Sequence, residues 1–249
     1  MLLVASKVYD KSKPVLGVNT DPERSEGHLC LPVRYTHAFS EALQKLRKGD
    51  FRWQWRQRIR MHLEGTGINP TPVDLHELQL SLQQHSKAHR ISTGTQSSTP
   101  HDSPEAPHLL PVRGLNEIFI GESLSSRSYN INKLVEQAVE DVLRIAKTKT
   151  GLEVPLNREF VESVTDTYNE SLIFSPEEDK LFFSVREPIV NRVFSNSRQR
   201  GFAKKVCVRS RCWDACMVVD GGTSFEFNDG AIATISLNEE DLLRTVILD

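Results

Sequence analysis

A regular alternation of apolar and polar side chains from Phe51 to Leu63 constrains the fold more than any other feature. Successive side chains of a β-strand point to opposite faces, so this period of two predicts one long strand. Its apolar face comprises Phe51, Trp53, Trp55, Ile59, Met61 and Leu63, and its basic face comprises Arg52, Arg56, Arg58, Arg60 and His62. We expect the apolar face to cover a core and the basic face to be solvated or to face anions.

The same strand raises the possibility of nucleic-acid binding, because arginines pair with phosphates and aromatic rings stack on bases. Here the two kinds of side chain point to opposite faces and cannot line one groove. The chain has 31 Lys and Arg against 33 Asp and Glu, a net charge of −2. We therefore expect no nucleic-acid partner.

Targeting and membrane signals are not evident in the sequence. No apolar run reaches the roughly 18–20 residues that a membrane helix needs. Lys7 interrupts the apolar opening before it has signal-peptide length, and early acids such as Asp10 and Asp21 are untypical of a transit peptide. We expect no membrane contact and neither an export nor an import signal in this chain.

The four cysteines are too few and too clustered for a secreted disulfide framework. They are Cys30, Cys207, Cys212 and Cys216. The spacing of the last three matches no common zinc motif, and no histidine follows His108. We expect a reducing compartment, thiols buried in strands and no metal site.

The fold class predicted from periodicity is α/β plus β. Residues 1–48 resemble the remnant of an α/β domain, with helical spacing over 2–9, a short strand over 14–18 and a helix over 36–47 capped by Thr36. Residues 49–249 resemble a β-rich domain with packed helices.

Within the β-rich part, residues 91–108 are rich in Ser, Thr and Pro and are expected to be disordered. Apolar spacing predicts helices at about 131–147, capped by Asn130, and at about 157–168. Strands are expected near 109–120, 181–185, 206–208, 217–219, 225–227, 231–237 and 245–248. The sequence Asn228-Asp229-Gly230 is typical of a tight hairpin turn between the two strands that flank it.

Familiar phosphate-binding loops are absent from the sequence, which has neither G-x-x-x-x-G-K-[ST] nor G-x-G-x-x-G. Asn116-Glu117 at a strand end is more informative. An amide beside a carboxylate can both donate to and accept from an adenine edge and ribose hydroxyls.

Several segments together resemble the NAD kinase family, most closely its mitochondrial members from animals. They are Gly17–Gly27, Trp55–Arg60, Leu115–Glu122, Val219–Gly222 and Phe227–Gly230, in this order. The resemblance covers most of the chain. It implies transfer of a phosphoryl group from ATP, with Mg²⁺, to the 2′-hydroxyl of the adenosine ribose of NAD, which gives NADP. It also implies a homodimer, a mitochondrial location, and a dinucleotide held between an N-terminal α/β domain and a β-rich C-terminal domain.

By this resemblance, Asn116 and Glu117 bind the adenosine of NAD, Asn19 closes a loop near the same ligand, and Asp220 lies in a late Asp-Gly turn. The catalytic residue is unassigned, because the family's Gly-Gly-Asp-Gly motif, whose aspartate is the expected base, is absent. The family's Thr-Gly-Ser loop and the strands before it are also missing. We expect a truncated, internally skipped and impaired form of the kinase.

Two other functions fit the sequence. A lipid kinase of the diacylglycerol type has a related two-domain plan, but it would have an apolar substrate cleft, whereas Asn116-Glu117 suits a nucleoside. A non-catalytic partner of the complete kinase would instead require a preserved dimer surface.

Overall fold

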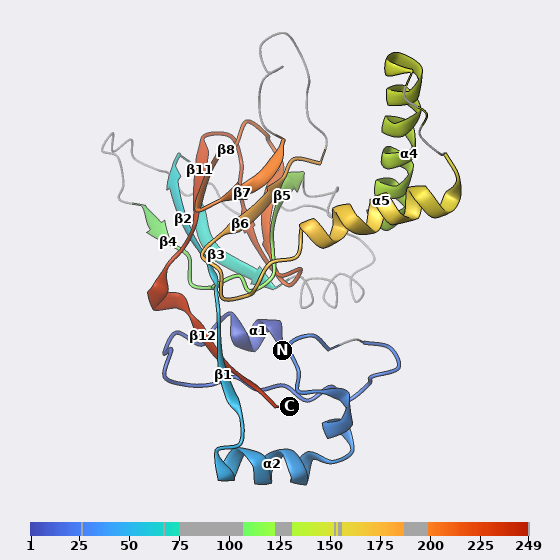
Figure 1. Cartoon of the computed structure of the whole chain (residues 1–249). Helices are drawn as coiled ribbons and strands as arrows, with labels where there is room; N and C mark the ends of the chain where they lie inside the picture. The colour runs from blue at the N-terminus through green and yellow to red at the C-terminus, as the bar shows by residue number, and fades with distance from the viewer. Residues whose placement is uncertain are drawn as a thin grey trace, which may run out of the picture. The chain divides into compact units, whose positions relative to one another are not determined.

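The computed structural model describes residues 1–25, 27–66, 68–74, 107–122, 131–151, 153, 156–186 and 199–248. The chain divides into two compact units, one formed by Met1–Ser125 with Asp179–Asp249 and the other by Ser126–Glu178. The first contains antiparallel sheets and short helices, and the second contains two long helices (Figure 1). The expected mixture of α and β structure, mostly β, is confirmed.

Two four-stranded antiparallel sheets form the body of the first unit. One has the order β4 (His108–Leu109), β2 (Ile59–Gly65), β11 (Ala231–Leu237) and β8 (Lys205–Arg209). The other has the order β3 (Asn69–Asp74), β10 (Thr223–Glu226), β9 (Ala215–Val219) and β5 (Ile118–Glu122). A separate ribbon pairs β6 (Leu181–Ser184) with β7 (Arg200–Ala203).

The main core lies between these sheets. Its buried side chains come from both sheets, from β6 and from the segments that follow β4 and β10: Met61, Leu63, Leu110, Val112, Leu181, Met217, Val219, Phe225, Phe227, Ala231, Ala233 and Ile235. Met61 and Leu63 lie on the expected apolar face, so the alternation correctly identified which side of β2 is buried.

The prediction of one long strand over 51–63 was wrong. The chain breaks at Gln57 and Arg58 into β1 (Arg52–Arg56), which pairs with β12 (Leu243–Ile247), and β2, which pairs with β11. Figure 1 shows β1 and β12 side by side, leading away from the two sheets toward α2. The break occurs because Arg58 turns inward to hydrogen-bond with backbone carbonyls and is completely buried.

The prediction of a solvated or anion-facing basic face was wrong for Arg58, for the same reason, but holds for Arg60. Arg58 is inaccessible to solvent, and Arg60 donates to the buried carboxylate of Asp241. Conversely, Trp53, which was expected on the core face, is 40% exposed. The centroid of its ring lies 3.5 Å from the guanidinium carbon of Arg244.

The N-terminal segment folds differently from the prediction. Helix α1 spans only Leu2–Ala5. Residues 14–18 form no strand, although Val15 N–H donates to the Arg244 carbonyl. Thr36 does not cap a helix. It ends a 3₁₀ helix (Val33–Thr36), and α2 begins later, at Phe39–Lys48.

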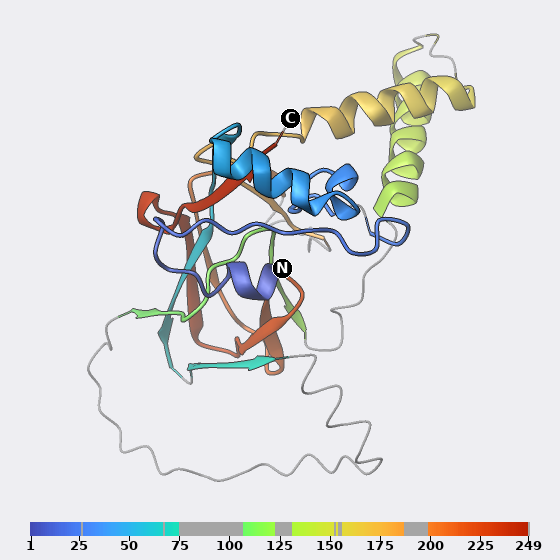
Figure 2. The same ribbon diagram turned by 90° about the horizontal axis from the view of Figure 1, so that it is seen from below.

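A second, smaller core lies beside α2. It comprises Leu31, Tyr35, Ala42 and Leu248, with Leu46, Phe51 and Val246 packed against it. The end of the chain therefore packs against its first fifty residues, and both termini lie on the side of α1 and α2 (Figure 2).

The second unit confirms both predicted helices. They are α4 (Ile131–Thr150) and α5 (Arg158–Ser171), and the side chain of Asn157 caps α5 by accepting from Phe160 N–H at 3.0 Å. The expected apolar face of α4 is not wholly buried, since Val142 is 64% exposed. The predicted cap Asn130 and residues 91–106 of the expected disordered loop lie outside the described residues, whereas His108 begins β4.

The hairpin expected at 228–230 was also wrong. Strand β10 pairs with β9 and β3, and β11 pairs with β2 and β8, so this turn connects two different sheets. Gly230 does have the positive φ of +90° that such a turn requires. Asn228 stabilises the crossing by accepting a hydrogen bond from Ala215 N–H.

The remaining expectations concern thiols and membranes. All four cysteines are free, and Cys207 is exposed, contrary to the expectation of buried thiols. Among the described helices, none is both long and apolar enough to cross a membrane.

Candidate functional site

The structure brings together three of the four predicted site residues. The carboxylate of Asp220 accepts backbone N–H groups from the turn that carries Asn116 and Glu117. Its Oδ2 accepts from Leu115 at 2.8 Å, and its Oδ1 accepts from Asn116 at 2.8 Å and Glu117 at 3.0 Å. The backbone N–H of Asp220 in turn donates to the carbonyl of Glu117 at 3.0 Å.

Sheet topology explains this meeting. Strands β5 and β9 are antiparallel neighbours in register Ile118 to Val219, so the residues before β5 lie beside those after β9. Asp220 then takes a positive φ of 50°, a backbone conformation that non-glycine residues adopt rarely and that Asp tolerates better than most. This conformation places its carboxylate under the three N–H groups.

The hydrogen bonds give Asp220 a positioning role. Charge-assisted hydrogen bonds to a carboxylate are stronger than neutral ones, and three of them fix the turn at residues 115–117. Direct contact between Asp220 and a substrate stays a prediction.

Asn116 and Glu117 present their side chains to solvent. Both residues are exposed, and within the described parts of the chain neither side chain has a hydrogen-bond partner. An amide and a carboxylate on a fixed backbone can together bind a ligand that offers both donors and acceptors. This turn is therefore a candidate polar binding site with a fixed backbone.

Asn19 is not brought to this turn by any contact between described residues. It is buried, 7% exposed, and its side chain stabilises its own loop. Its Nδ2 donates to the Ser25 carbonyl at 2.7 Å and its Oδ1 accepts from Asp21 N–H at 3.1 Å. Gly27 closes the loop at φ +63°, where a Cβ would lie 2.6 Å from Asn19 Nδ2.

A buried ionic cluster, which sequence reasoning missed, lies at the junction of β1, β2 and β12. The Asp241 carboxylate accepts from Arg60 Nε at one oxygen and from Arg113 Nε at the other, the latter at 2.6 Å. Arg58 donates to the Asp241 carbonyl and, through Nη1, to the carbonyls of Ala5 at 2.7 Å and Val8 at 2.6 Å.

Two opposing effects set the pKa of Asp241. Burial disfavours the charged carboxylate, but the hydrogen bonds and positive charges of Arg60 and Arg113 outweigh it and hold the pKa below its usual range. The sequence signal was weak, because Asp241 follows Glu239 and Glu240 and looks like part of a solvated acidic turn.

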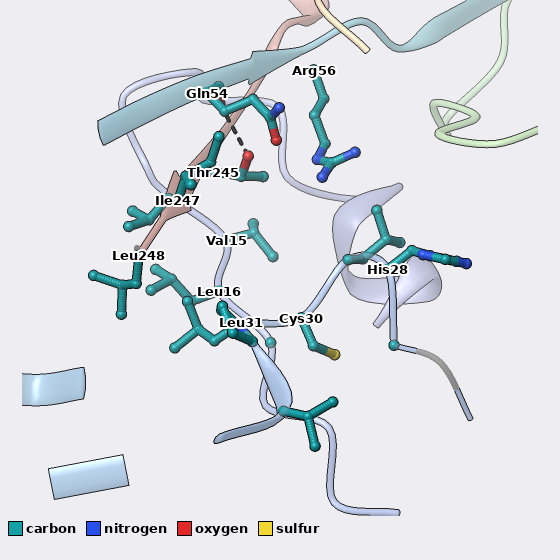
Figure 3. Close-up of a pocket in the computed structure, with 16 residues that line it drawn as sticks. Val15, Leu16, His28, Cys30, Leu31, Gln54, Arg56, Thr245, Ile247 and Leu248 are labelled. Atoms are coloured by element: carbon teal, nitrogen blue, oxygen red, sulfur yellow. Dashed lines mark hydrogen bonds between the residues drawn. The ribbon is translucent and has the colours of Figure 1, made fainter. Parts of the chain in front are cut away.

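The structure also contains a pocket of about 340 Å³ between the N-terminal segment and the β1–β12 ribbon (Figure 3). Its lining comes from residues 15–17, residues 27–33, Gln54, Arg56 and residues 245–248. None of the four predicted site residues lines it.

The residues that the structure describes offer little for a divalent cation. Among the described residues, no group of three or more His, Cys, Asp or Glu side chains could hold a metal ion. Asp220 and Asp241 already accept hydrogen bonds at both carboxylate oxygens. The described residues do not form a Mg²⁺ site.

Comparison with known proteins gives a consistent result, although no family model matches the chain. The sequence is 62% identical over 281 residues to "NAD kinase 2, mitochondrial" of Rattus norvegicus, covering all of this chain and 65% of the rat protein. The identically named proteins of Homo sapiens and Xenopus tropicalis are 62% and 57% identical, and the chain covers 63% and 69% of their lengths. The chain thus spans less than two thirds of the rat and human proteins.

The match also bears on the expected internal gap. The alignment with the rat protein extends over 281 positions, more than the 249 residues of this chain. The rat protein therefore has residues between the matched ones that this chain lacks.

Proposed function

This chain belongs to the NAD kinase family, and from that premise we propose that it forms the dinucleotide-binding part of an enzyme that phosphorylates NAD. The proposed reaction transfers a phosphoryl group from ATP to the 2′-hydroxyl of the adenosine ribose and gives NADP. The relatives found lend no support to the alternatives of a lipid kinase or a non-catalytic partner.

One observation carries the assignment of the binding site: the Asp220 carboxylate holds the backbone of residues 115–117. Binding costs less when a site is already ordered, so a fixed turn favours ligand affinity. In the proposed complex the Asn116 amide binds the adenine edge and the Glu117 carboxylate accepts from ribose hydroxyls. Asn19 acts through its loop, whose shape it maintains.

Chemistry at the 2′-hydroxyl needs positioned substrates, neutralised phosphate charge and an acceptor for the hydroxyl proton. The Gly-Gly-Asp-Gly sequence that would supply this acceptor is absent from the chain. Loss of a catalytic group commonly lowers the rate by several powers of ten. We expect dinucleotide binding with little or no turnover.

The remaining partners follow from the family. Because the described residues form no Mg²⁺ site, Mg²⁺ is expected to arrive with the phosphates of ATP. The names of the relatives support a mitochondrial location, and a homodimer is the expected assembly. The division into an α/β remnant over 1–48 and a β-rich domain over 49–249 belongs to the same proposal.

The test is a calorimetric and thermal-shift titration with NAD and NADP, run beside an NADP-forming assay with ATP and Mg²⁺. Asn116→Ala and Glu117→Gln should each weaken NAD binding about tenfold or more, the value of one or two lost hydrogen bonds. Asp220→Asn should weaken binding as well, because Asn offers one acceptor oxygen instead of two.

Asp229→Asn is the matched control, since Asp229 is an exposed aspartate in another turn of the same unit. It should leave NAD affinity unchanged. If NAD binds saturably and none of the three site substitutions changes its affinity, the assignment of the site is wrong. Absence of NAD binding by a chain that melts cooperatively would refute the proposed function.

A further inference from the structure

The pocket beside the β1–β12 ribbon contains a cation that has no counter-ion among the described residues. Arg56, the last residue of β1, lines this pocket. Figure 3 shows its side chain extending from the strand toward Val15 and His28. Its Nε is buried and has no hydrogen-bond partner among the described residues.

Comparison with two other arginines shows that this arrangement is unusual even within this protein. Arg58 and Arg244 also have one buried nitrogen without a partner. Arg58, however, donates to three backbone carbonyls, and Arg244 donates to the Ser12 carbonyl and stacks on Trp53. In the described structure, Arg56 has neither a hydrogen bond nor an ion pair.

Burial of this guanidinium has an energetic consequence. Partial removal from water lowers the pKa of Arg56, but an arginine side chain stays charged in proteins. A partly buried charge whose buried Nε has no partner is less favourable than a fully solvated one, and an anion that binds beside it recovers that free energy. The positive charge of Arg56 in the unbound pocket therefore favours binding of an anion.

The rest of the lining determines what kind of anion fits. About half of the pocket surface is apolar, and the apolar side chains along it are Val15, Leu16, Leu29, Leu31, Pro32, Val33, Val246, Ile247 and Leu248. Among the lining residues that the structure describes, none is acidic. A volume of about 340 Å³ lies at the low end of the roughly 300–1,000 Å³ of small-molecule sites, so the pocket suits a ligand smaller than a dinucleotide.

We propose that this pocket binds a small oxyanion, a carboxylate or a phosphate, carried on an apolar body, with Arg56 as its counter-ion. The guanidinium matches the planar, two-oxygen face of either group with parallel N–H donors. The apolar part of the pocket wall packs against the apolar body of the ligand. Gly17 and Gly27, which flank the Asn19 loop, line the pocket, but residues 115–117 do not. Variants at 116 and 117 therefore test the dinucleotide site separately from Arg56.

The first experiment measures binding to the intact chain by calorimetry with three probes: hexanoate, hexanamide and inorganic phosphate. Hexanoate should bind and the neutral hexanamide should bind at least about tenfold more weakly, the effect of losing a charge-assisted hydrogen bond. Phosphate binding equal to or tighter than hexanoate would assign the pocket to phosphorylated ligands, and weaker binding would assign it to carboxylates. If neither anion binds at concentrations up to about 10 mM, the proposal is wrong.

Variants connect the binding to Arg56. Arg56→Gln should weaken anion binding about tenfold or more, while Arg56→Lys should retain part of it because the charge remains. Arg47→Gln, at an exposed position on α2, is the matched control and should bind as the wild type does. Equal affinity in Arg56→Gln and wild type would overturn the proposal.

A measurement on the wild-type chain avoids any question of folding. Cys30 lines the pocket, so bound hexanoate should slow its alkylation by iodoacetamide, read residue by residue by mass spectrometry. The exposed Cys207 lies on β8, outside the pocket lining, and serves as the internal control. Protection of Cys30 alone supports the proposal, whereas no protection, or equal protection of both thiols, contradicts it.

Discussion

The buried ionic cluster allows a quantitative test through the substitution Asp241→Asn. This change keeps the size of the side chain but removes the negative charge between Arg60 and Arg113. The side chains of Asp241 and Arg113 are each 6% exposed and that of Arg60 is 16% exposed. Both arginines would therefore lose the Asp241 carboxylate while staying largely shielded from water.

The expected magnitude follows from this burial. Removing one partner of a buried ion pair costs about 3–5 kcal/mol. Arg60 would keep Glu240 at 3.3 Å, and Arg113 Nη1 would keep the carbonyls of Leu110 and Val112 at 2.8 and 3.0 Å. These remaining contacts place the expected loss of unfolding free energy at the lower end, about 3 kcal/mol.

Urea unfolding followed by tryptophan fluorescence measures the loss, because Trp53 and Trp55 lie in β1, the strand that ends beside Arg58. The midpoint should fall while the m-value stays constant. Glu240→Gln is the control: its carboxylate also pairs with Arg60, but it is 78% exposed, so its loss should cost no more than about 1 kcal/mol. Equal effects of the two substitutions would refute the reasoning from burial.

Two further predictions concern pH and backbone conformation. Because the folded-state pKa of Asp241 is lowered, its stabilisation is complete above the unfolded pKa of about 3.9 and is lost as the pH falls through the folded value. The difference in unfolding free energy between wild type and Asp241→Asn should thus be constant from about pH 5 to 7 and shrink in stronger acid. A difference that grows in acid would contradict the lowered pKa of Asp241. Gly65→Ala should destabilise the chain by about 2 kcal/mol or more in thermal unfolding, since at φ +106° its Cβ would lie 2.2 Å from the Gly230 carbonyl oxygen. Gly49→Ala, at φ +77° with open space around it, should cost only about 1 kcal/mol, and a larger loss there than at Gly65 would show that backbone contact does not decide the effect.

Helices and strand faces with a strong local pattern were predictable from the sequence. The spacing of apolar residues identified α4 and α5, and Asn157 was recognisable as the start of α5. Met61 and Leu63 were correctly assigned to the core. These features depend on periodicity and on a capping side chain within a few residues, so the sequence contains the information locally.

Partners of the strands were not predictable in the same way. The alternation over 51–63 continues smoothly past Gln57, yet β1 and β2 pair with different strands. The break depends on carbonyls at Ala5, Val8 and Asp241, which lie far from Arg58 in sequence. No local pattern distinguishes an arginine that turns inward from one that faces water.

At the candidate site, residue types and their order were enough to recognise the family, and they predicted Asn116, Glu117 and Asp220 as substrate-binding residues. Only the tertiary structure showed that the Asp220 carboxylate holds the backbone of the other two, and that Asn19 is occupied with its own loop. Residue types and order express which chemistry is available. Burial and hydrogen-bond pairing decide where that chemistry can act, and both arise from contacts between segments about a hundred residues or more apart, such as Asp220 with Asn116 and Arg58 with Asp241.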